Sequence, residues 1–218
     1  MNEKSSSSRT AKGDSKSKLT PPVEGPINVA FVLSEGATVI DFAGPWEVFQ
    51  DADPGEPYGS MPFHLYTVSD ELKLIHASGG LKIMPDYTFK DAPLPQVIVV
   101  PAQGGHSEMM LDWLQRNTAT NNVTMSVCTG AFILARAGLL DGLKVTTHHQ
   151  FLDDLAKRYP KVKVQKGVRF VENEKVSTAA GLSSGIDLAL RVVERYFGRD
   201  VAQKTTEMME YQGRSWIV

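Results

Sequence analysis

The sequence has little of several features that would direct it to a particular class of protein. It contains a single cysteine, Cys128, in 218 residues, so an internal disulfide is excluded and a reducing compartment such as the cytoplasm is expected. No apolar run approaches the ~18 residues that a transmembrane helix requires, and the first residues lack the apolar segment of a secretory signal. We therefore expect a cytoplasmic protein that has no membrane partner.

Strong charge and ligand-binding motifs are also missing. The formal net charge is −2, and acidic and basic residues are interspersed after the first twenty residues, so no basic surface for nucleic acid is indicated. There is no His-Glu-x-x-His or Cys-x-x-Cys motif, and there is no Gly-x-Gly-x-x-Gly loop. These absences predict neither a metal site nor a nucleotide cofactor, and we expect the protein to use no cofactor.

The composition of the chain changes near Pro26. Residues 1–26 contain four consecutive serines, five Lys or Arg residues and three prolines. Such a composition cannot build a core, so we predict a disordered tail over residues 1–26. Residues 27–218 are long enough to bury a sizeable core, and we predict that they form one domain.

Short β-branched runs alternate with Ala- and Leu-rich helical patterns over most of residues 27–218. We predict strands over Ile27–Leu33, Phe63–Ser69, Gln96–Val100, Val123–Val127, Lys144–Thr147 and Val162–Val164, a two-stranded excursion over Leu74–Phe89, and a hairpin of Arg169–Val171 with Lys175–Thr178. We predict helices over Pro45–Asp51, Ser107–Arg116 (capped by Ser107), Ala131–Leu140, Phe151–Arg158, Ser183–Phe197 and Val201–Tyr211. This alternation predicts an α/β fold, a three-layer α/β/α sandwich around a mainly parallel sheet.

Cys128 lies at the sharpest change of structure that the sequence predicts. It joins a buried strand to a buried helix with only Thr129 and Gly130 between them. A strand that turns into a helix this abruptly pushes the side chain at the bend out over the strand's carboxyl end, which is the geometry of a nucleophile elbow. The helix amino terminus is expected to favour the thiolate, and the N–H groups of Thr129 and Gly130 are candidate donors to a bound substrate. The alternative is that Cys128 is a small buried hydrophobe.

Other candidate residues follow neighbouring strands. Asp41 lies between apolar residues that would raise the pKa of its carboxyl, although it could instead cap the helix that starts at Pro45. Gly104 and Gly105 follow a buried strand, where their backbone can approach a ligand closely, or where they form an ordinary tight turn. His148 follows another strand, and histidines in such positions are more often structural than catalytic.

Ligands of open α/β sheets bind beyond the carboxyl ends of the strands, where these residues are expected to meet. Cys128 would be the nucleophile, and the N–H groups of Gly105 and Thr129 would stabilise developing charge. Asp41 would transfer protons, with His148 as a possible helper.

Three ordered motifs resemble the ThiJ/PfpI superfamily, which belongs to the class I glutamine amidotransferase-like folds. The first runs from Ser126 to Phe132 (Ser-Val-Cys-Thr-Gly-Ala-Phe) and continues through Ala137–Gly142 and Thr146–His148. The second, Asp41–Phe49, resembles the segment that supplies the acidic partner of the family's cysteine. The third, Gly181–Ala189, is similar to the family's penultimate helix. The resemblance extends from Ile27 to about Tyr211 and implies a flavodoxin-like α/β domain.

Asp41, and Thr129 after the cysteine, resemble the residues of isocyanide hydratases, and the same pair occurs in the amidase-like domains of AraC-type regulators. Those regulators carry an additional helix-turn-helix region of about 100 residues, for which the chain leaves no room after Val218, so we expect a stand-alone enzyme. The resemblance implies a homodimer that acts on a small molecule. Its expected reaction is hydration of an isocyanide to an N-substituted formamide through a thioimidate on Cys128, with Thr129 orienting Asp41 or the intermediate.

Relatives of this superfamily also include glyoxalase-like, deglycase-like, amidase-like and peptidase-like thiol enzymes. A non-catalytic sensor of small molecules or of oxidation is a further possibility from a different functional class. The fold and the nucleophile do not choose among these activities.

Overall fold

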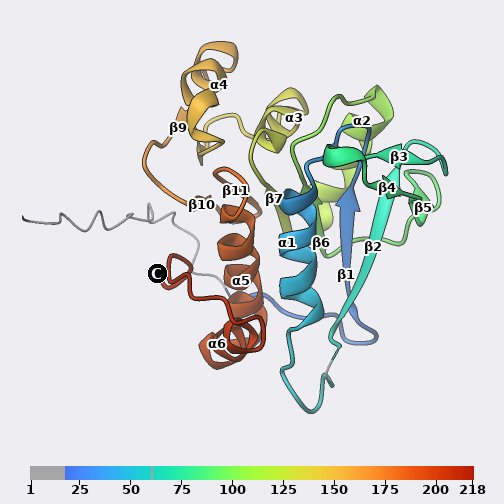
Figure 1. Cartoon of the computed structure of the whole chain (residues 1–218), viewed down its shortest axis with the longest axis vertical. Coiled ribbons are helices and arrows are strands. Elements are labelled where there is room, and N and C mark those ends of the chain that lie inside the picture. The colour runs from blue at the N-terminus through green and yellow to red at the C-terminus, as the bar shows by residue number, and fades with distance from the viewer. Residues whose placement is uncertain (1–17, 60) are drawn as a thin grey trace, which may run out of the picture.

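The computed structural model describes residues 18–59 and 61–218, and its centre is a seven-stranded sheet. The strand order is β10-β11-β7-β6-β1-β2-β5 (Figure 1). The strands are β1 (Ile27–Val32), β2 (Phe63–Ser69), β5 (Tyr87–Thr88), β6 (Val97–Val100), β7 (Val123–Ser126), β10 (Phe170–Glu172) and β11 (Val176–Ala179). All pairings in this sheet are parallel except that of β10 with β11. The predicted mainly parallel sheet is confirmed.

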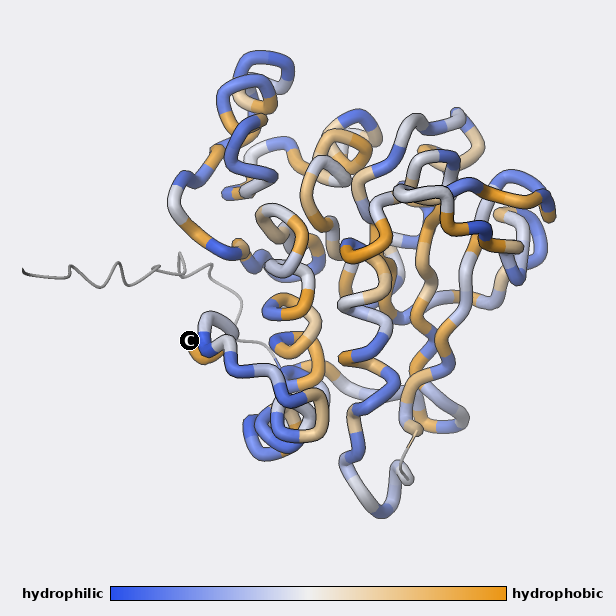
Figure 2. The backbone as a smooth tube through the Cα atoms, viewed as in Figure 1, coloured by the Kyte–Doolittle hydropathy of each residue, from blue (hydrophilic) through white to orange (hydrophobic). Residues whose placement is uncertain are grey.

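Helices cover both faces of the sheet. They are α1 (Val39–Gln50), α2 (Glu108–Thr120), α3 (Gly130–Arg136), α4 (Leu152–Arg158), α5 (Ser184–Phe197) and α6 (Arg199–Met208). Alternate residues of β1 point to opposite faces: Val29 and Phe31 pack in the cluster that includes α1, α5 and α6, whereas Ala30 and Val32 pack in the cluster that includes α2, α3 and α4. Figure 2 shows the resulting apolar strands in the interior. The predicted three layers are therefore present.

Helix α1 begins at Val39, six residues before the predicted start at Pro45. Pro45 was expected in the first turn because its ring prevents a backbone hydrogen bond, but it lies inside the helix. The N–H of Val39 donates to the Ser78 hydroxyl at 3.0 Å. This N–H at the start of the helix therefore has a hydrogen-bond partner from a residue far away in the sequence. Packing of α1 against α5 and the sheet then outweighs the local cost of Pro45.

Three short pairings lie outside or at the edge of the predicted pattern. The strand predicted over Lys144–Thr147 is present as β8 (Lys144–Val145), two residues shorter than predicted, and it pairs with β9 (Lys163–Val164) in a separate two-stranded sheet and not in the main one. Its place beside β7 is taken by β11. The excursion forms β3 (Ile75–His76) and β4 (Lys82–Ile83) around a 3-10 turn at Ser78–Gly80, but Tyr87–Thr88 returns to the main sheet as β5.

The helix after Cys128 is shorter than predicted. It spans Gly130–Arg136 and ends before Gly138, whose φ of 73° is left-handed and closes the turn. The cap of α2 is as predicted, because the Ser107 hydroxyl accepts the N–H of Met110. A further 3-10 turn, His149–Phe151, precedes α4.

The amino-terminal segment is docked from Leu19 onward, which corrects part of the predicted disordered tail. The Leu19 side chain is buried, its N–H donates to the carbonyl of Arg195 at 2.8 Å, and the Asn122 side chain donates to the carbonyl of Thr20. The rest of that prediction, over residues 1–17, lies outside the described residues. Within residues 18–59 and 61–218, none of the helices combines the length and the apolar character needed to cross a membrane.

Candidate active site around Cys128

Cys128 occupies a strained backbone position between β7 and α3. Its φ is 56°, in the left-handed region that residues other than glycine rarely adopt. Its N–H donates to the carbonyl of Ala180 at 2.7 Å, and its own carbonyl accepts the hydroxyl of Thr147 at 2.7 Å. These contacts hold the peptide groups on both sides of Cys128, and strain kept in this way is typical of functional sites.

Gly130 is required by close packing and not by a substrate. A Cβ atom on this residue would lie 2.1 Å from the carbonyl oxygen of Val100, so α3 can approach the end of β6 only without a side chain here. The Gly130 N–H donates to the carbonyl of Val127 at 3.0 Å. The prediction that this N–H faces a substrate is therefore wrong, because the elbow turn uses it.

Cys128 as a residue is 8% exposed, and hydrogen-bond donors surround its sulfur. The N–H and hydroxyl of Thr129 and the N–H of Leu182 hydrogen-bond to it and lower the pKa of the thiol. Burial and the negative charge of Asp41 act more strongly in the opposite direction and raise the pKa of Cys128 to about 11. The Thr129 N–H at the start of α3 therefore favours the thiolate, as predicted, but desolvation and the charge of Asp41 outweigh it, so that the pKa as a whole is raised.

Polar contacts distinguish this thiol from a cysteine that only fills space. A packing cysteine needs neither a left-handed backbone nor three hydrogen-bond donors around its sulfur. The combination at Cys128 favours a chemical role over the alternative of a buried hydrophobe.

Asp41 extends from the first turn of α1 toward the end of β6. It is fully buried, and its Oδ2 accepts the N–H of Ala102 at 3.1 Å, while the Ala102 carbonyl accepts the N–H of Thr38 at 2.8 Å. Asp41 therefore does not cap the helix, and that alternative is excluded. Burial raises the pKa of its carboxyl to about 6, against the opposing effects of Ala102 and of the Cys128 thiol. The predicted rise is confirmed.

The carboxyl of Asp41 and the thiol of Cys128 each shift the pKa of the other. The thiol lowers the pKa of Asp41, and the Asp41 charge raises the pKa of Cys128. Within the described part of the chain, Oδ1 of Asp41 has no hydrogen-bond partner of ordinary geometry. Between the two pKa values the pair holds one proton, and this proton can be carried by either group.

The Gly104–Gly105 loop lies beside a different hollow. The N–H of Gly104 donates to the carbonyl of Glu35 at 2.8 Å. It is therefore not free to bind a ligand, contrary to the expectation from the sequence. Gly105 has open space where a Cβ would stand. It lines a hollow of about 440 Å³ together with residues such as Ser34 and Asp70, and the lining does not include Cys128 or Asp41. This hollow is therefore not the space around the thiol.

His148 packs against the turn that contains Gly181 and Leu182. A Cβ on Gly181 would lie 2.4 Å from Cδ2 of His148, so the imidazole packs directly on Gly181. Its Nδ1 accepts the N–H of Gln150 at 3.3 Å, and burial together with His149 lowers its pKa, which keeps the ring neutral at neutral pH. Among the described residues no hydrogen bond joins His148 to Cys128 or Asp41.

Leu182 is the site residue that the sequence did not indicate. Its φ of 52° is left-handed, its side chain is 46% exposed, and its N–H points at the sulfur of Cys128. A leucine has no sequence signal for a backbone donor, and the glycine that precedes it has an ordinary φ. Only the packed turn between β11 and α5 identifies this donor.

Within residues 18–59 and 61–218, no group of three or more His, Cys, Asp or Glu side chains is arranged to hold a metal ion. The site that the structure defines is a thiol at a strand–helix elbow, a buried acid from the opening βα unit, and backbone donors around the sulfur. These features define a class of α/β proteins with a cysteine at a strand–helix elbow. Residues 27–195 match the DJ-1/PfpI family, and the chain belongs to that family.

Relatives of known description include both an enzyme and regulators. The chain is 31% identical over 191 residues to an isonitrile hydratase of Pseudomonas putida, covering 85% of this chain and 78% of that protein. It is 26% identical over 198 residues to the HTH-type transcriptional regulator GbdR of Pseudomonas aeruginosa, covering 89% of this chain. The chain spans about half of that regulator, 53% of its length.

A solved structure agrees with the fold. A ThiJ/PfpI family protein from Pseudomonas syringae superposes with a TM-score of 0.76 at 27% identity, covering 87% of this chain and 77% of that one. The predicted family and fold class are therefore confirmed.

Proposed function

We propose that the protein is a cysteine-dependent enzyme that hydrates a small isocyanide to an N-substituted formamide. The observation that supports this most is the Cys128–Asp41 pair, a thiol and a buried acid that together hold one transferable proton. The similarity to an isonitrile hydratase, isonitrile being another name for isocyanide, supports the choice of substrate. Isocyanide hydration needs both a nucleophile and a proton carrier, and this pair supplies both.

The first half of the proposed reaction forms a carbon–sulfur bond. The thiol gives its proton to Asp41 as the sulfur attacks the terminal carbon of R–N≡C. Asp41 then passes that proton to the same carbon, which yields a thioimidate, R–N=CH–S–Cys128. The N–H groups of Thr129 and Leu182 stabilise the thiolate during attack, because they already hydrogen-bond to the sulfur.

The second half consumes one water. Asp41, now ionised, takes a proton from water as the water oxygen adds to the thioimidate carbon, and it passes that same proton to the imine nitrogen. The carbon–sulfur bond then breaks, and the sulfur leaves with the proton of the new hydroxyl group. The products are R–NH–CHO and the free thiol, so that the net change is addition of one water molecule.

His148 has a supporting place in this scheme. Its ring packs on Gly181, next to the Leu182 donor, and burial lowers its pKa. We assign it the role of holding this turn, with direct proton transfer as the alternative that a kinetic test separates. We also retain two predictions from the sequence, a homodimer and a cytoplasmic location, which light scattering and cell fractionation measure.

The experiment is to incubate the purified protein with an alkyl isocyanide and to follow the isocyanide infrared band and the formamide by chromatography. We expect turnover by the native protein and none above the background rate with Cys128→Ala. Asp41→Asn should retain the thiol but lose ~10²-fold or more in rate, as is typical of a removed general acid or base. Equal formamide production by Cys128→Ala would rule out the proposed mechanism.

A second candidate function is non-catalytic sensing of a small molecule. The match to GbdR, which covers 89% of this chain, favours it, as does a thiol that burial keeps protonated. Such a sensor would bind an isocyanide or another small ligand without consuming it. Saturable binding by calorimetry with no product, retained in Cys128→Ala, would support sensing over catalysis.

A further inference from the structure

We propose that the ion pair between the half-buried Arg169 and the buried Asp187 is a positioning device for the thiol, which holds the Ala180–Ser183 turn so that the Leu182 N–H stays on the sulfur of Cys128. This inference depends on Cys128 being the reactive group of the proposed function, but it does not depend on the identity of the substrate. Neither residue touches the sulfur. They act through the turn between β11 and α5.

A chain of backbone hydrogen bonds connects Arg169 to Cys128. The carbonyl of Arg169 accepts the N–H of Ala180 at 2.8 Å, and the carbonyl of Ala180 accepts the N–H of Cys128 at 2.7 Å. The main chain at Arg169 therefore sets one side of the turn and, through Ala180, the elbow itself.

The side chain of Arg169 secures the other side of the same turn. Its Nε and Nη2 donate to Oδ2 of Asp187 at 2.8 and 2.6 Å, and Nη2 also donates to the Ser183 hydroxyl at 3.2 Å. Asp187 is fully buried in the first turn of α5, and its Oδ1 accepts the Tyr211 hydroxyl at 3.1 Å. Arg169 thus contacts both ends of the segment that presents the Leu182 N–H, through its carbonyl at Ala180 and through its guanidinium at Ser183.

Backbone strain shows that this segment must be held by other contacts. In the described part of the chain, three residues other than glycine have a left-handed φ, and they are Cys128, Leu182 and Glu210. Leu182 lies between the two anchor points of Arg169, and Glu210 directly precedes Tyr211. A non-glycine residue persists in this conformation only when its surroundings enforce it. The three strained positions are therefore the thiol, its donor and the neighbour of the tyrosine that completes the Asp187 site.

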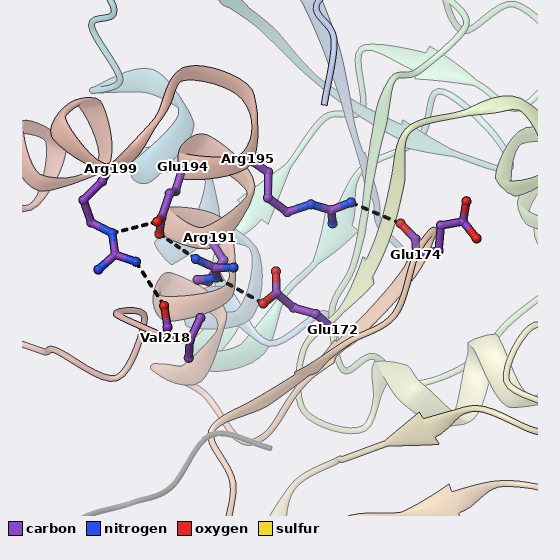
Figure 3. A network of polar contacts seen from close by, with 7 residues as sticks. All are labelled: Glu172, Glu174, Arg191, Glu194, Arg195, Arg199 and Val218. Carbon is purple, nitrogen blue, oxygen red and sulfur yellow. Dashed lines mark hydrogen bonds and ion pairs between the residues drawn. The ribbon is translucent and has the colours of Figure 1, made fainter. Parts of the chain in front are cut away.

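A second ionic network farther along α5 provides a matched control (Figure 3). Arg191 contacts Glu172 of β10 at 3.1 Å and Glu194 at 2.6 Å, and Glu194 also contacts Arg199 at 2.6 Å. This network joins α5 to β10 and α6, and in the described part of the chain none of its hydrogen bonds or ion pairs reaches residues 180–184. Glu194→Gln therefore disturbs buried charges on the same helix without releasing the turn.

The test measures the reactivity of Cys128 toward iodoacetamide in the full chain by mass spectrometry, between about pH 5 and pH 9, which brackets the Asp41 pKa of about 6. Thermal unfolding confirms that each variant is folded.

Loss of one hydrogen bond to the thiolate is expected to slow alkylation by about 3- to 10-fold at neutral pH. We expect this slowing in both Arg169→Gln and Asp187→Asn, a smaller one in Tyr211→Phe, and native reactivity in Glu194→Gln. The inflection near pH 6 that belongs to Asp41 should stay in place.

The two charge changes separate positioning from a direct field effect. A direct field would make Arg169→Gln slower and Asp187→Asn faster, because the first removes a positive charge and the second a negative one. Opposite effects, or equal slowing by Glu194→Gln, would overturn the proposal. If the two charge variants fail to fold, Tyr211→Phe decides alone, and native reactivity in it contradicts the proposal. Isocyanide turnover is not used, so this outcome is independent of the substrate assignment.

Discussion

Oδ2 of Asp41 accepts the N–H of Ala102 at 3.1 Å, which fixes a buried carboxyl from α1 just after the end of β6, the neighbour of the strand β7 that leads to Cys128. The hydrogen bond uses one oxygen and leaves Oδ1 for a proton. Because the carboxyl and the thiol shift each other's pKa, the two groups act as one acid–base unit. The proposed chemistry depends on this unit.

The first prediction concerns the pH dependence of Cys128 alkylation. Below the Asp41 pKa of about 6 both groups are protonated, and the rate is low. As the pH rises through this value one proton leaves the pair, and the share of the form with a thiolate and a protonated Asp41 rises to a plateau. The plateau is expected to extend toward the Cys128 pKa of about 11, where loss of the second proton raises the rate again.

Asp41→Asn is the control for this profile. Without the carboxylate the inflection near pH 6 should disappear. The rate should then rise about tenfold per pH unit, as for an isolated thiol below its pKa. An inflection that persists in Asp41→Asn would assign it to another group.

The second prediction concerns the fit between α3 and β6. A Cβ on Gly130 would lie 2.1 Å from the Val100 carbonyl oxygen, so Gly130→Ala is expected to cost about 3 kcal/mol or to prevent folding. Gly105→Ala is the matched variant, because nothing lies within 4 Å of its added Cβ. It should change the free energy of unfolding by less than about 1 kcal/mol. Urea denaturation compares the two variants, and similar costs would contradict the close approach.

The third prediction separates the two roles of His148. If His148 only packs on Gly181, His148→Ala should lower kcat/KM by less than about tenfold. If His148 is a direct general acid or base, the same substitution should lower kcat/KM by ~10²-fold or more. His149→Ala is the control, because that neighbouring side chain is exposed. Steady-state kinetics on an alkyl isocyanide decides, and a loss in the larger range would assign proton transfer to His148.

The fourth prediction tests the docked amino-terminal segment. Leu19 is 9% exposed, and its side chain belongs to the core around α5, so Leu19→Ala should lower the free energy of unfolding by about 2 kcal/mol. Val23 is fully exposed at 102%, so Val23→Ala should leave stability unchanged. Equal stability of the two variants would restore the original prediction of a disordered segment here.

The elbow and the acid could be predicted from the sequence because each depends on local pattern. An apolar strand, a small-residue turn and a helix in direct succession indicate where Cys128 must point, and the flanking residues of Asp41 indicate its burial. The strand predicted at Lys144–Thr147 shows the limit of such patterns. Its β-branched residues fit a core strand, but β11 pairs with β7 instead, and only long-range pairing decides between them.

The remaining site features arise from contacts between distant segments. The Leu182 donor needs a left-handed turn, which depends on Arg169, Asp187 and Tyr211 from three separate elements. The sequence predicts the contribution of the helix after Cys128, which lowers the pKa of the thiol, but not the burial and the facing charge of Asp41, which raise it by more. Desolvation and pair charges are properties of the assembled site.

The most direct test of the central claim is the intact mass of the protein during incubation with an alkyl isocyanide. We predict an added mass of one isocyanide molecule, located on Cys128 by peptide mapping, in acid-quenched samples of the native protein taken during turnover. The adduct should form more slowly in Asp41→Asn, because Asp41 also transfers the proton in the step that forms it, and it should be absent in Cys128→Ala. Formamide production without any adduct on Cys128, undiminished in Cys128→Ala, would contradict the account.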